Sequence, residues 1–472
     1  MSNIHQMKNQ ANETAPIKTI NPATEEMIEE YTVQSEAEVK QIIDDAHEAF
    51  KKWRSEPQDT RSEIIKKLAT AIRNHKDELA ELMTVEMGKP ISQAYKEVDR
   101  CASLCEYSAE EAIRELKTEE RPLEGGQKGM IVYQPLGVVL SIQPWNFPLY
   151  QAVRSTIPNI LVGNTVLLKH AKNVSGMSKK LGELYAEVGL PDNVFTPLFL
   201  EDEGTEVILK SDKVVGVALT GSSRAGKAVG ELAGANIKKT LLELGGSDPY
   251  IVLDDADLDK AVETCVTGRI ANSGQTCVNA KRFIVMEGVY EEFKKKYVEA
   301  MSKVEYGDPM NEDTQMGPLA RKDLRETLHD QVQASIGAGA TCLLGGEMPE
   351  GKGYFYPATV LENIKPGMPA YDDELFGPVA SLFKVSSEDE AIEIANDHRY
   401  GLGGGVLSSN TERAIEVAKR IETGMVSVNG FFGSQANMPF GGIKQSGHGR
   451  EHGGFGIKEF VNIKSIYVGD ND

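Results

Sequence analysis

Short apolar runs alternate with longer stretches of helical spacing along most of the chain. Two long helices are expected first, over residues 36–55 and 60–86, where apolar residues recur at helical spacing. From residue 137 onward the apolar runs are short and bounded by turn residues, which is typical of strands buried on both faces. The expected strands are GVVLSI (137–142), NTVLLK (164–169), NVFTPLF (193–199), VVGVALTG (214–221) and KTLLELGG (239–246), with helices near 149–161, 175–188, 203–210 and 224–234.

This alternation of strand and helix predicts a parallel sheet with helices on both faces, and ligands are expected beyond the carboxyl ends of its strands. A second series of the same kind begins at residue 250, so we divide the core near residue 246. The fold class is therefore α/β with two doubly wound parallel-sheet domains. The strands of the second series are YIVL (250–253), RFIVM (282–286), TVLENI (359–364) and GMVSVNG (424–430).

Two further segments, KGMIVYQP (128–135) and EFVNIKSIYV (459–468), alternate like exposed strands and belong to neither sheet. Such strands often pair with another subunit, because an open strand edge otherwise aggregates. We therefore expect residues 114–135 and 448–472 to form a small β oligomerisation element in a homodimer or homotetramer.

The charge balance narrows the range of partners. A formal charge of −20 over 472 residues repels phosphate backbones, and no basic stripe offsets it, so no nucleic-acid partner is expected. No apolar run approaches the roughly 18 to 20 residues that span a bilayer, and the first residues lack the plan of a signal peptide. We expect no membrane partner and a cytoplasmic location.

The five cysteines form no CxxC pair and have no histidine at ligand spacing, which argues against a disulfide framework or a metal site. Cys277, in NSGQTCVNA (272–280), follows small polar residues and a glycine. It is either an inert core sulfur or a nucleophile held at the end of a loop. Glu243 bears on that choice because it ends an otherwise apolar strand. A buried carboxylate there costs folding free energy unless it is paired or has a catalytic role.

Three motifs therefore carry candidate chemistry, each with a plainer alternative. Glu243 is either a base for the thiol of Cys277, which together would make a covalent acyl-transfer site, or a capped or salt-bridged glutamate. Asn146, in QPWNFP (143–148), can offer its amide to a developing oxyanion, or it marks a turn with a packed tryptophan. LTGSSRAGKA (219–228) opens a helix and nearly fits a P-loop, but Ala228 lacks the hydroxyl that would hold magnesium. The alternative that this segment binds a pyrophosphate without a catalytic metal is retained.

The order and spacing of these motifs resemble the aldehyde dehydrogenase superfamily along nearly the whole chain. The matching stretches are PWNFP, GNTVLLK, TGS, LELGG, NSGQTC, ELFGPV (374–379) and PFGGIKQSGHGRE (439–451). Within that superfamily, KHA (169–171) followed by Asn173 looks like the bacterial succinate-semialdehyde dehydrogenases. The resemblance implies a Rossmann-like dinucleotide-binding domain (1–113 and 136–245) and a catalytic domain (246–447).

The resemblance also assigns catalytic roles. Cys277 would attack the aldehyde carbon, and the oxyanion of the thiohemiacetal would sit between the Asn146 side chain and the backbone N–H of Cys277. A hydride would pass to the nicotinamide and leave a thioester. Glu243 would activate the water that hydrolyses this thioester.

For the cofactor, NADP or NAD, the resemblance implies that Lys169 binds the adenine ribose, Ser222 the pyrophosphate and Glu374 the nicotinamide ribose. Phe376 and Phe440 would shape the site by packing, Phe440 on the substrate side. The full set of expected cofactor residues is Pro144, Trp145, Lys169, Lys172, Gly221, Ser222, Gly245, Glu374 and Phe376.

Two departures from the family pattern concern the cofactor. Lys172 stands where the family has an acidic residue that holds both ribose hydroxyls, and a lysine can pair with a 2′-phosphate, so NADP should be accepted. The segment LEDEG (200–204) lacks the glycine-rich loop of many relatives, which leaves that part of the cofactor cleft open.

Arg154 bears on the substrate. It lies eight residues after Asn146 on an expected helix, at a position that carries the carboxylate-binding arginine in succinate-semialdehyde dehydrogenases. A guanidinium in an apolar tunnel favours an aldehyde with a remote carboxylate, such as succinate semialdehyde. The alternative for Arg154 is an ion pair within the protein.

Other functions remain as alternatives. They are a broad-specificity or hydroxy-aldehyde dehydrogenase, a coenzyme A dependent relative, which usually lacks the glutamate present here as Glu243, and a non-catalytic protein on the same fold. A cysteine hydrolase would need a histidine partner for Cys277, and no histidine falls in a recognisable motif.

Overall fold

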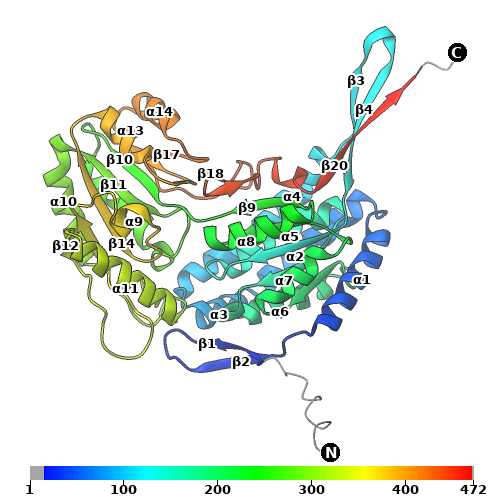
Figure 1. Ribbon diagram of the computed structural model, residues 1–472, viewed down its shortest axis with the longest axis horizontal. Coiled ribbons are helices and arrows are strands. Elements are labelled where there is room, and N and C mark those ends of the chain that lie inside the picture. Colours follow the sequence, from blue (N-terminus) through cyan, green and yellow to red (C-terminus); the bar gives the residue numbers. More distant parts are fainter. Residues whose placement is uncertain (1–14, 470–472) are drawn as a thin grey trace, which may run out of the picture.

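Two largely parallel β-sheets, each covered by helices, lie side by side in the computed structural model, which describes residues 15–469 (Figure 1). The first sheet has six strands in the order β19-β9-β8-β5-β6-β7, and only the edge strand β19 runs antiparallel. Its strands are β5 (Val138–Gln143), β6 (Thr165–His170), β7 (Phe195–Leu198), β8 (Val214–Thr220), β9 (Lys239–Glu243) and β19 (Gly447–His448). β6 is buried at every residue, and its apolar residues 166–168 are flanked by the buried polar residues Thr165, Lys169 and His170.

Within the described part of the chain, eight helices precede or connect these strands. They are α1 (Glu36–Trp53), α2 (Gln58–Asn74), α3 (Lys76–Met87), α4 (Ile91–Glu115), α5 (Pro148–Val162), α6 (Ser175–Glu187), α7 (Asp202–Lys210) and α8 (Ser223–Ala235). The single helix expected over 60–86 is wrong, because the chain leaves helical geometry at His75 (φ −97°, ψ 23°). Buried apolar residues continue on both sides of that break, so their spacing alone does not reveal it.

The second sheet has seven strands in the order β12-β13-β14-β11-β10-β16-β17, with β12 antiparallel to its neighbour. Its strands are β10 (Asp248–Val252), β11 (Ala280–Met286), β12 (Thr341–Leu344), β13 (Thr359–Glu362), β14 (Val379–Val385), β16 (Gly405–Leu407) and β17 (Ser427–Val428). The strand expected over 424–430 is therefore much shorter than predicted. The helices are α9 (Leu258–Ile270), α10 (Glu287–Ser302), α11 (Lys322–Gly337), α12 (Pro369–Asp372), α13 (Glu388–Asn396) and α14 (Thr411–Arg420). β9 and β10, on either side of residue 246, belong to different sheets.

A third, antiparallel sheet projects from the body and ends near the C-terminus (Figure 1). It consists of β3 (Glu119–Pro122), β4 (Lys128–Pro135) and β20 (Val461–Val468), with β4 in the centre. Ile463 and Tyr467 of β20 are exposed. The range 448–472 expected for the oligomerisation element also includes residues outside this sheet, since Glu451, His452 and Ile457 are buried in the body.

Small elements complete the fold. They are the hairpin β1 (Ile17–Ile20) and β2 (Met27–Tyr31), the pair β15 (Tyr400–Gly401) and β18 (Ile443–Lys444), and the short helices η1 (Glu124–Gly126), η2 (Lys172–Val174), η3 (Ala271–Gly274) and η4 (Gly456–Lys458). Across residues 15–469 no helix is both long and apolar enough to cross a membrane.

Candidate active site

The carboxyl ends of four neighbouring parallel strands carry most of the candidate residues. Asn146 follows β5, Lys169 lies near the end of β6, Gly221 and Ser222 follow β8, and Glu243 ends β9. The backbone N–H of Gly221 donates to the carbonyl of Glu243 at 3.0 Å, which joins two of these ends directly. Open α/β sheets bind ligands at this edge, as the sequence pattern predicts.

The loop before Cys277 has an unusual backbone. Asn272, Ser273 and Gly274 are consecutive residues with φ of 54°, 53° and 76°. At Gly274 a Cβ atom would lie 2.2 Å from the carbonyl carbon of Gly377, so no larger residue fits. Side chains that hold the loop include that of Ser273, whose hydroxyl donates to the carbonyl of Gly317 at 3.0 Å. A backbone this constrained fixes the position of the residue that follows it.

Asn146 is tied to the same loop. Its amide donates to the carbonyl of Gln275 at 3.0 Å, while the Asn272 amide donates to the carbonyl of Asn146 at 2.8 Å and also to that of Gln275 at 3.2 Å. This network fixes the oxyanion candidate against the segment that carries Cys277. Asn272 was not singled out from the sequence, although it lies within the quoted motif NSGQTC.

The thiol of Cys277 is half-buried among apolar side chains that include Leu402, Met425 and Phe440. Burial raises its pKa to about 12, and the positive charges of Lys281 and Arg154 oppose that rise. Lys281 donates to the carbonyl of Cys277 at 2.7 Å. The resting group is therefore a thiol, and reaction requires its proton to be removed. Lys281 was not foreseen; its charge four residues after Cys277 was the available signal.

Glu243 is 2% exposed, and neither of its carboxylate oxygens has a hydrogen-bond partner among the described residues. Gly441 makes room for it, since a Cβ atom there would lie 2.5 Å from Oε1. Burial raises the pKa of Glu243 well above its ordinary value, the nearby Glu451 raises it further, and Arg154 opposes both. A buried, unpaired carboxyl group with a raised pKa suits general acid–base work better than a structural ion pair.

Arg154 lies in α5 and is engaged within the protein. Its Nε atom lies 2.7 Å from Oε2 of Glu451, and the two side chains are 2% and 6% exposed. The guanidinium carbon also lies 4.5 Å from the ring centre of Phe440. The structure thus contains the intramolecular ion pair that was the alternative for Arg154. Among the described residues, the guanidinium of Arg154 is paired and not free. Glu451 was missed, although it ends the quoted motif PFGGIKQSGHGRE.

The segment before β14 carries Glu374 and Phe376, an acidic and an aromatic candidate. Trp145 and Phe376 pack edge to face with ring centres 5.7 Å apart, and Pro144 precedes Trp145 in the turn after β5. Glu374 accepts from the backbone N–H of Gly246 at 3.1 Å and pairs with Lys281 at 3.3 Å.

Gly245 also lies against Glu374. A Cβ atom at Gly245 would lie 2.4 Å from Oε2 of Glu374, so a larger residue there would require the Glu374 carboxylate to move. Glu374 therefore packs closely against the backbone that follows β9.

The two lysines expected at the cofactor site have acidic partners from residues 201 and 202, at the start of α7. Lys169 lies 3.1 Å from Asp202, and Lys172 forms an ion pair with Glu201. These partners were not predicted, but both lie in LEDEG, the segment that departs from the family pattern.

The chemistry of these groups fits a dinucleotide. Ammonium groups such as those of Lys169 and Lys172 can pair with phosphates, and a carboxylate such as that of Glu374 can accept hydrogen bonds from ribose hydroxyls. The first turn of α8, capped by the Ser222 hydroxyl, which accepts from the N–H of Ala225 at 3.2 Å, provides backbone donors for a pyrophosphate.

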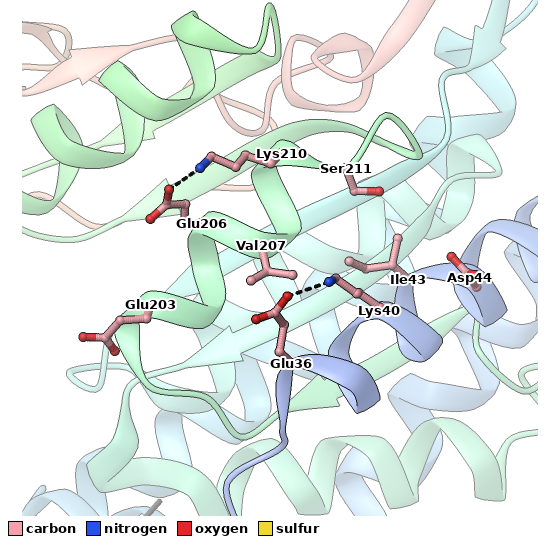
Figure 2. A pocket seen from close by; sticks show the side chains of 9 residues that line it. All are labelled: Glu36, Lys40, Ile43, Asp44, Glu203, Glu206, Val207, Lys210 and Ser211. Carbon is pink, nitrogen blue, oxygen red and sulfur yellow. Dashed lines mark hydrogen bonds and ion pairs between the residues drawn. The ribbon is translucent and has the colours of Figure 1, made fainter. Parts of the chain in front are cut away.

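A separate cavity of about 470 Å³ lies between α1 and α7, on the outer side of the first sheet (Figure 2). Figure 2 shows that acidic and basic side chains from both helices line it, among them the pairs Glu36–Lys40 and Glu206–Lys210. None of the candidate catalytic or cofactor residues lines this cavity.

Comparisons with known proteins show what the whole chain is similar to. Residues 8–466 match the Aldehyde dehydrogenase family. The chain is 42% identical over 449 residues to a succinate semialdehyde dehydrogenase [NAD(P)+] of Escherichia coli K12, covering 95% of this chain and 97% of that protein. It is 44% identical over 451 residues to a succinate-semialdehyde dehydrogenase [NADP(+)] of Deinococcus radiodurans, covering 96% of this chain and 94% of that protein.

A solved structure is similar at the level of the whole fold. The succinic semialdehyde dehydrogenase of Streptococcus pyogenes, in complex with NADP+ as the cofactor, superposes with a TM-score of 0.94 at 39% identity. The superposition covers 96% of this chain and 100% of that one.

Proposed function

The chain belongs to the aldehyde dehydrogenase family, and we propose that it oxidises succinate semialdehyde to succinate with NAD or NADP as the hydride acceptor. The names of similar proteins from two bacteria support this substrate. The observation that carries the proposal is a set of three groups: the half-buried thiol of Cys277, the amide of Asn146 tied to the loop before it, and the unpaired carboxyl of Glu243, whose pKa responds to the charge of Arg154 as that of the thiol does.

Cys277 is proposed as the nucleophile. The thiol proton passes to the carboxylate of Glu243 and from there to solvent, while the sulfur adds to the aldehyde carbon and the π electron pair of the carbonyl moves onto its oxygen, which gains a negative charge. The second N–H of the Asn146 amide and the backbone N–H of Cys277 are the proposed donors to that oxygen. The hydrogen bonds to Gln275 and from Asn272 support this role, because a donor that is already oriented stabilises an oxyanion at little further cost.

Glu243 is proposed as the base for hydrolysis. When bound, the nicotinamide supplies the hydride acceptor that turns the thiohemiacetal on Cys277 into a thioester. Glu243 then takes a proton from the water whose oxygen adds to the thioester carbon. It returns that proton to the sulfur as the C–S bond breaks, so Cys277 leaves as a thiol and the product is the carboxylic acid. Its burial without a hydrogen-bond partner supports this assignment, since a carboxyl group held in this way has its pKa moved toward the working pH.

The cofactor is proposed to lie along the strand ends, with the residues already expected from the sequence. Lys169 and Lys172 would meet the adenine ribose, Ser222 the pyrophosphate and Glu374 the nicotinamide ribose. The close packing of Gly245 against Glu374 supports the last of these, because it holds the carboxylate at the end of β9.

The carboxylate of the substrate is proposed to share the guanidinium of Arg154 with Glu451. Arg154 is buried beside Phe440, and the thiol of Cys277 senses its charge. A substrate carboxylate must therefore bind to a guanidinium that already has one acidic partner, which sets a limit on the affinity that Arg154 can supply.

The assembly is proposed to be a homodimer or homotetramer in the cytoplasm. The projecting sheet supports the assembly, since β20 exposes Ile463 and Tyr467 and leaves one backbone edge open for another chain. Light scattering that shows a monomer at micromolar concentration would contradict this.

The function is tested by following the absorbance of the reduced cofactor with a panel of aldehydes, each with NAD and NADP separately. We expect Cys277→Ala to abolish oxidation while dinucleotide binding persists. Glu243→Gln should give a burst of reduced cofactor followed by a slow steady state, because thioester hydrolysis is slowed more than the steps before it. Full activity of the alanine variant would refute the mechanism.

A further inference from the structure

The segment between β7 and α7 presents an acidic side chain to a lysine of the proposed cofactor site. Glu201 is the N-cap residue of α7, and Lys172 is the first residue of η2, which is separated from β6 by Ala171. Their side chains form an ion pair in which the lysine is 41% and the glutamate 38% exposed. Within residues 15–469 no other carboxylate lies within 4.0 Å of this ammonium group.

The backbone of Lys172 is held by a hydrogen bond, whereas the side chains of Lys172 and Glu201 are partly exposed to solvent. The carbonyl of Lys172 accepts from the hydroxyl of Ser175 at 2.9 Å, which fixes the turn into α6. An ion pair that is this exposed is weak and exchangeable, because water screens it and both side chains keep other conformations. A ligand with more negative charge than a carboxylate can therefore take the place of Glu201.

We propose that Glu201 is a specificity-determining residue for the cofactor, which occupies Lys172 in the free protein and must release it before a dinucleotide 2′-phosphate binds there. This inference rests on the proposed function. A 2′-phosphate near neutral pH carries between one and two negative charges, so it gains from Lys172 and is repelled by Glu201. NAD carries a hydroxyl at that position and gains little from either residue. Glu201 thus reduces the advantage that Lys172 gives to NADP.

The neighbouring pair is expected to behave differently. Asp202 lies 3.1 Å from Lys169, which we assign to the ribose that both cofactors share. Neutralising Asp202 should therefore change the affinity for NAD and NADP in the same direction. Glu203, one residue further along α7 and labelled in Figure 2, lines the outer cavity and has no ion pair among the described residues. It provides a matched control for the loss of one negative charge.

The test measures the Kd of NADP and of NAD by titration calorimetry without aldehyde, for the wild-type protein, Glu201→Gln and Glu203→Gln. We expect Glu201→Gln to lower the Kd for NADP by about fivefold and that for NAD by less than about twofold. Glu203→Gln should leave both values within about twofold of wild type. An equal gain for both dinucleotides, or an unchanged Kd for NADP, overturns the inference.

A double-mutant cycle identifies the route of the effect. If Glu201 acts by occupying Lys172, the gain from Glu201→Gln should shrink in a Lys172→Gln background, and an undiminished gain there overturns the inference. Failure of the wild-type protein to bind either dinucleotide refutes the proposed function and this inference with it. Binding of both with no effect of Glu201→Gln refutes the inference alone.

Discussion

Arg154–Glu451 and Lys172–Glu201 are the same kind of contact in two different surroundings. In the first pair both side chains are almost wholly buried, and in the second both are more than a third exposed. Burial removes the hydration of both charges, so neither partner of the first pair can be left alone without a large cost. The exposed pair loses little when it opens, because water replaces each partner. The first pair is thus part of the folded structure, and the second can be exchanged for a ligand.

The buried pair is also connected to a further segment of the chain, through the backbone of Glu451. Glu451 and Phe440 exchange two backbone hydrogen bonds of 2.7 and 2.8 Å, and the Phe440 ring lies against the guanidinium of Arg154. One contact therefore holds α5, the segment before β18 and the segment after β19 together. The exposed pair joins only η2 to the start of α7.

The largest expected difference between the pairs is in stability. Arg154→Ala should lower the free energy of unfolding by about 3 to 5 kcal/mol, because it leaves Glu451 buried without its cation. Lys172→Ala should lower it by no more than about 1 kcal/mol. Denaturant unfolding of both variants measures this, and similar losses would show that burial does not separate the two pairs.

A second effect concerns the substrate. Arg154→Gln should reduce kcat/KM for succinate semialdehyde by about ten- to a hundredfold, since a charged hydrogen bond is worth about 1.5 to 3 kcal/mol. An uncharged aldehyde of the same length should lose much less. Steady-state kinetics with both aldehydes test this, and a melting curve checks that the variant is folded. An equal loss for both would mean that the charge of Arg154 serves the protein and not the substrate.

A smaller effect concerns the thiol and pH. Burial raises the pKa of Cys277 to about 12, so its thiolate fraction, and hence its alkylation rate by iodoacetamide, should rise about tenfold per pH unit from pH 7 to 9. Arg154 lowers this pKa, so Arg154→Gln should slow alkylation at every pH in that range. Lys172→Gln should leave the rate of alkylation unchanged. A rate that is flat with pH would show that the free thiol is already ionised.

The smallest effect concerns the exposed pair and salt. Lys172→Glu should move the preference toward NAD by about fivefold, and raising the ionic strength should reduce that difference, because salt screens exposed charges. The effect of Arg154→Gln on alkylation should depend much less on salt. Dinucleotide titrations at low and high salt check this, and equal salt dependence would contradict the comparison.

The sequence predicted well those features that depend on neighbouring residues. Buried strands appear as nearly continuous apolar runs, as in β8, and the motifs near Asn146, Glu243 and Cys277 provided the candidates for the site. The break at His75 escaped because the apolar spacing runs on through it. The order of strands within each sheet could not be predicted in this way, since it depends on which runs pair in space.

The charged partners could not be predicted for a related reason. Glu451 and Glu201 meet their cations only after the chain has folded, and no periodicity links residues so far apart. An unpaired arginine and a paired one look alike in a sequence. That is why Arg154 was expected to be available for a substrate, and why the acidic segment before α7 had no assigned role.

The projecting sheet has a consequence for synthesis. Its central strand β4 pairs with β3 at once, but its other partner, β20, begins about 330 residues after β4 ends, from Pro135 to Val461. At about 5 to 20 residues per second, a ribosome needs roughly 15 to 70 seconds to supply it. During that time β4 of the nascent chain has one edge without its native partner, and such an edge can pair with another chain.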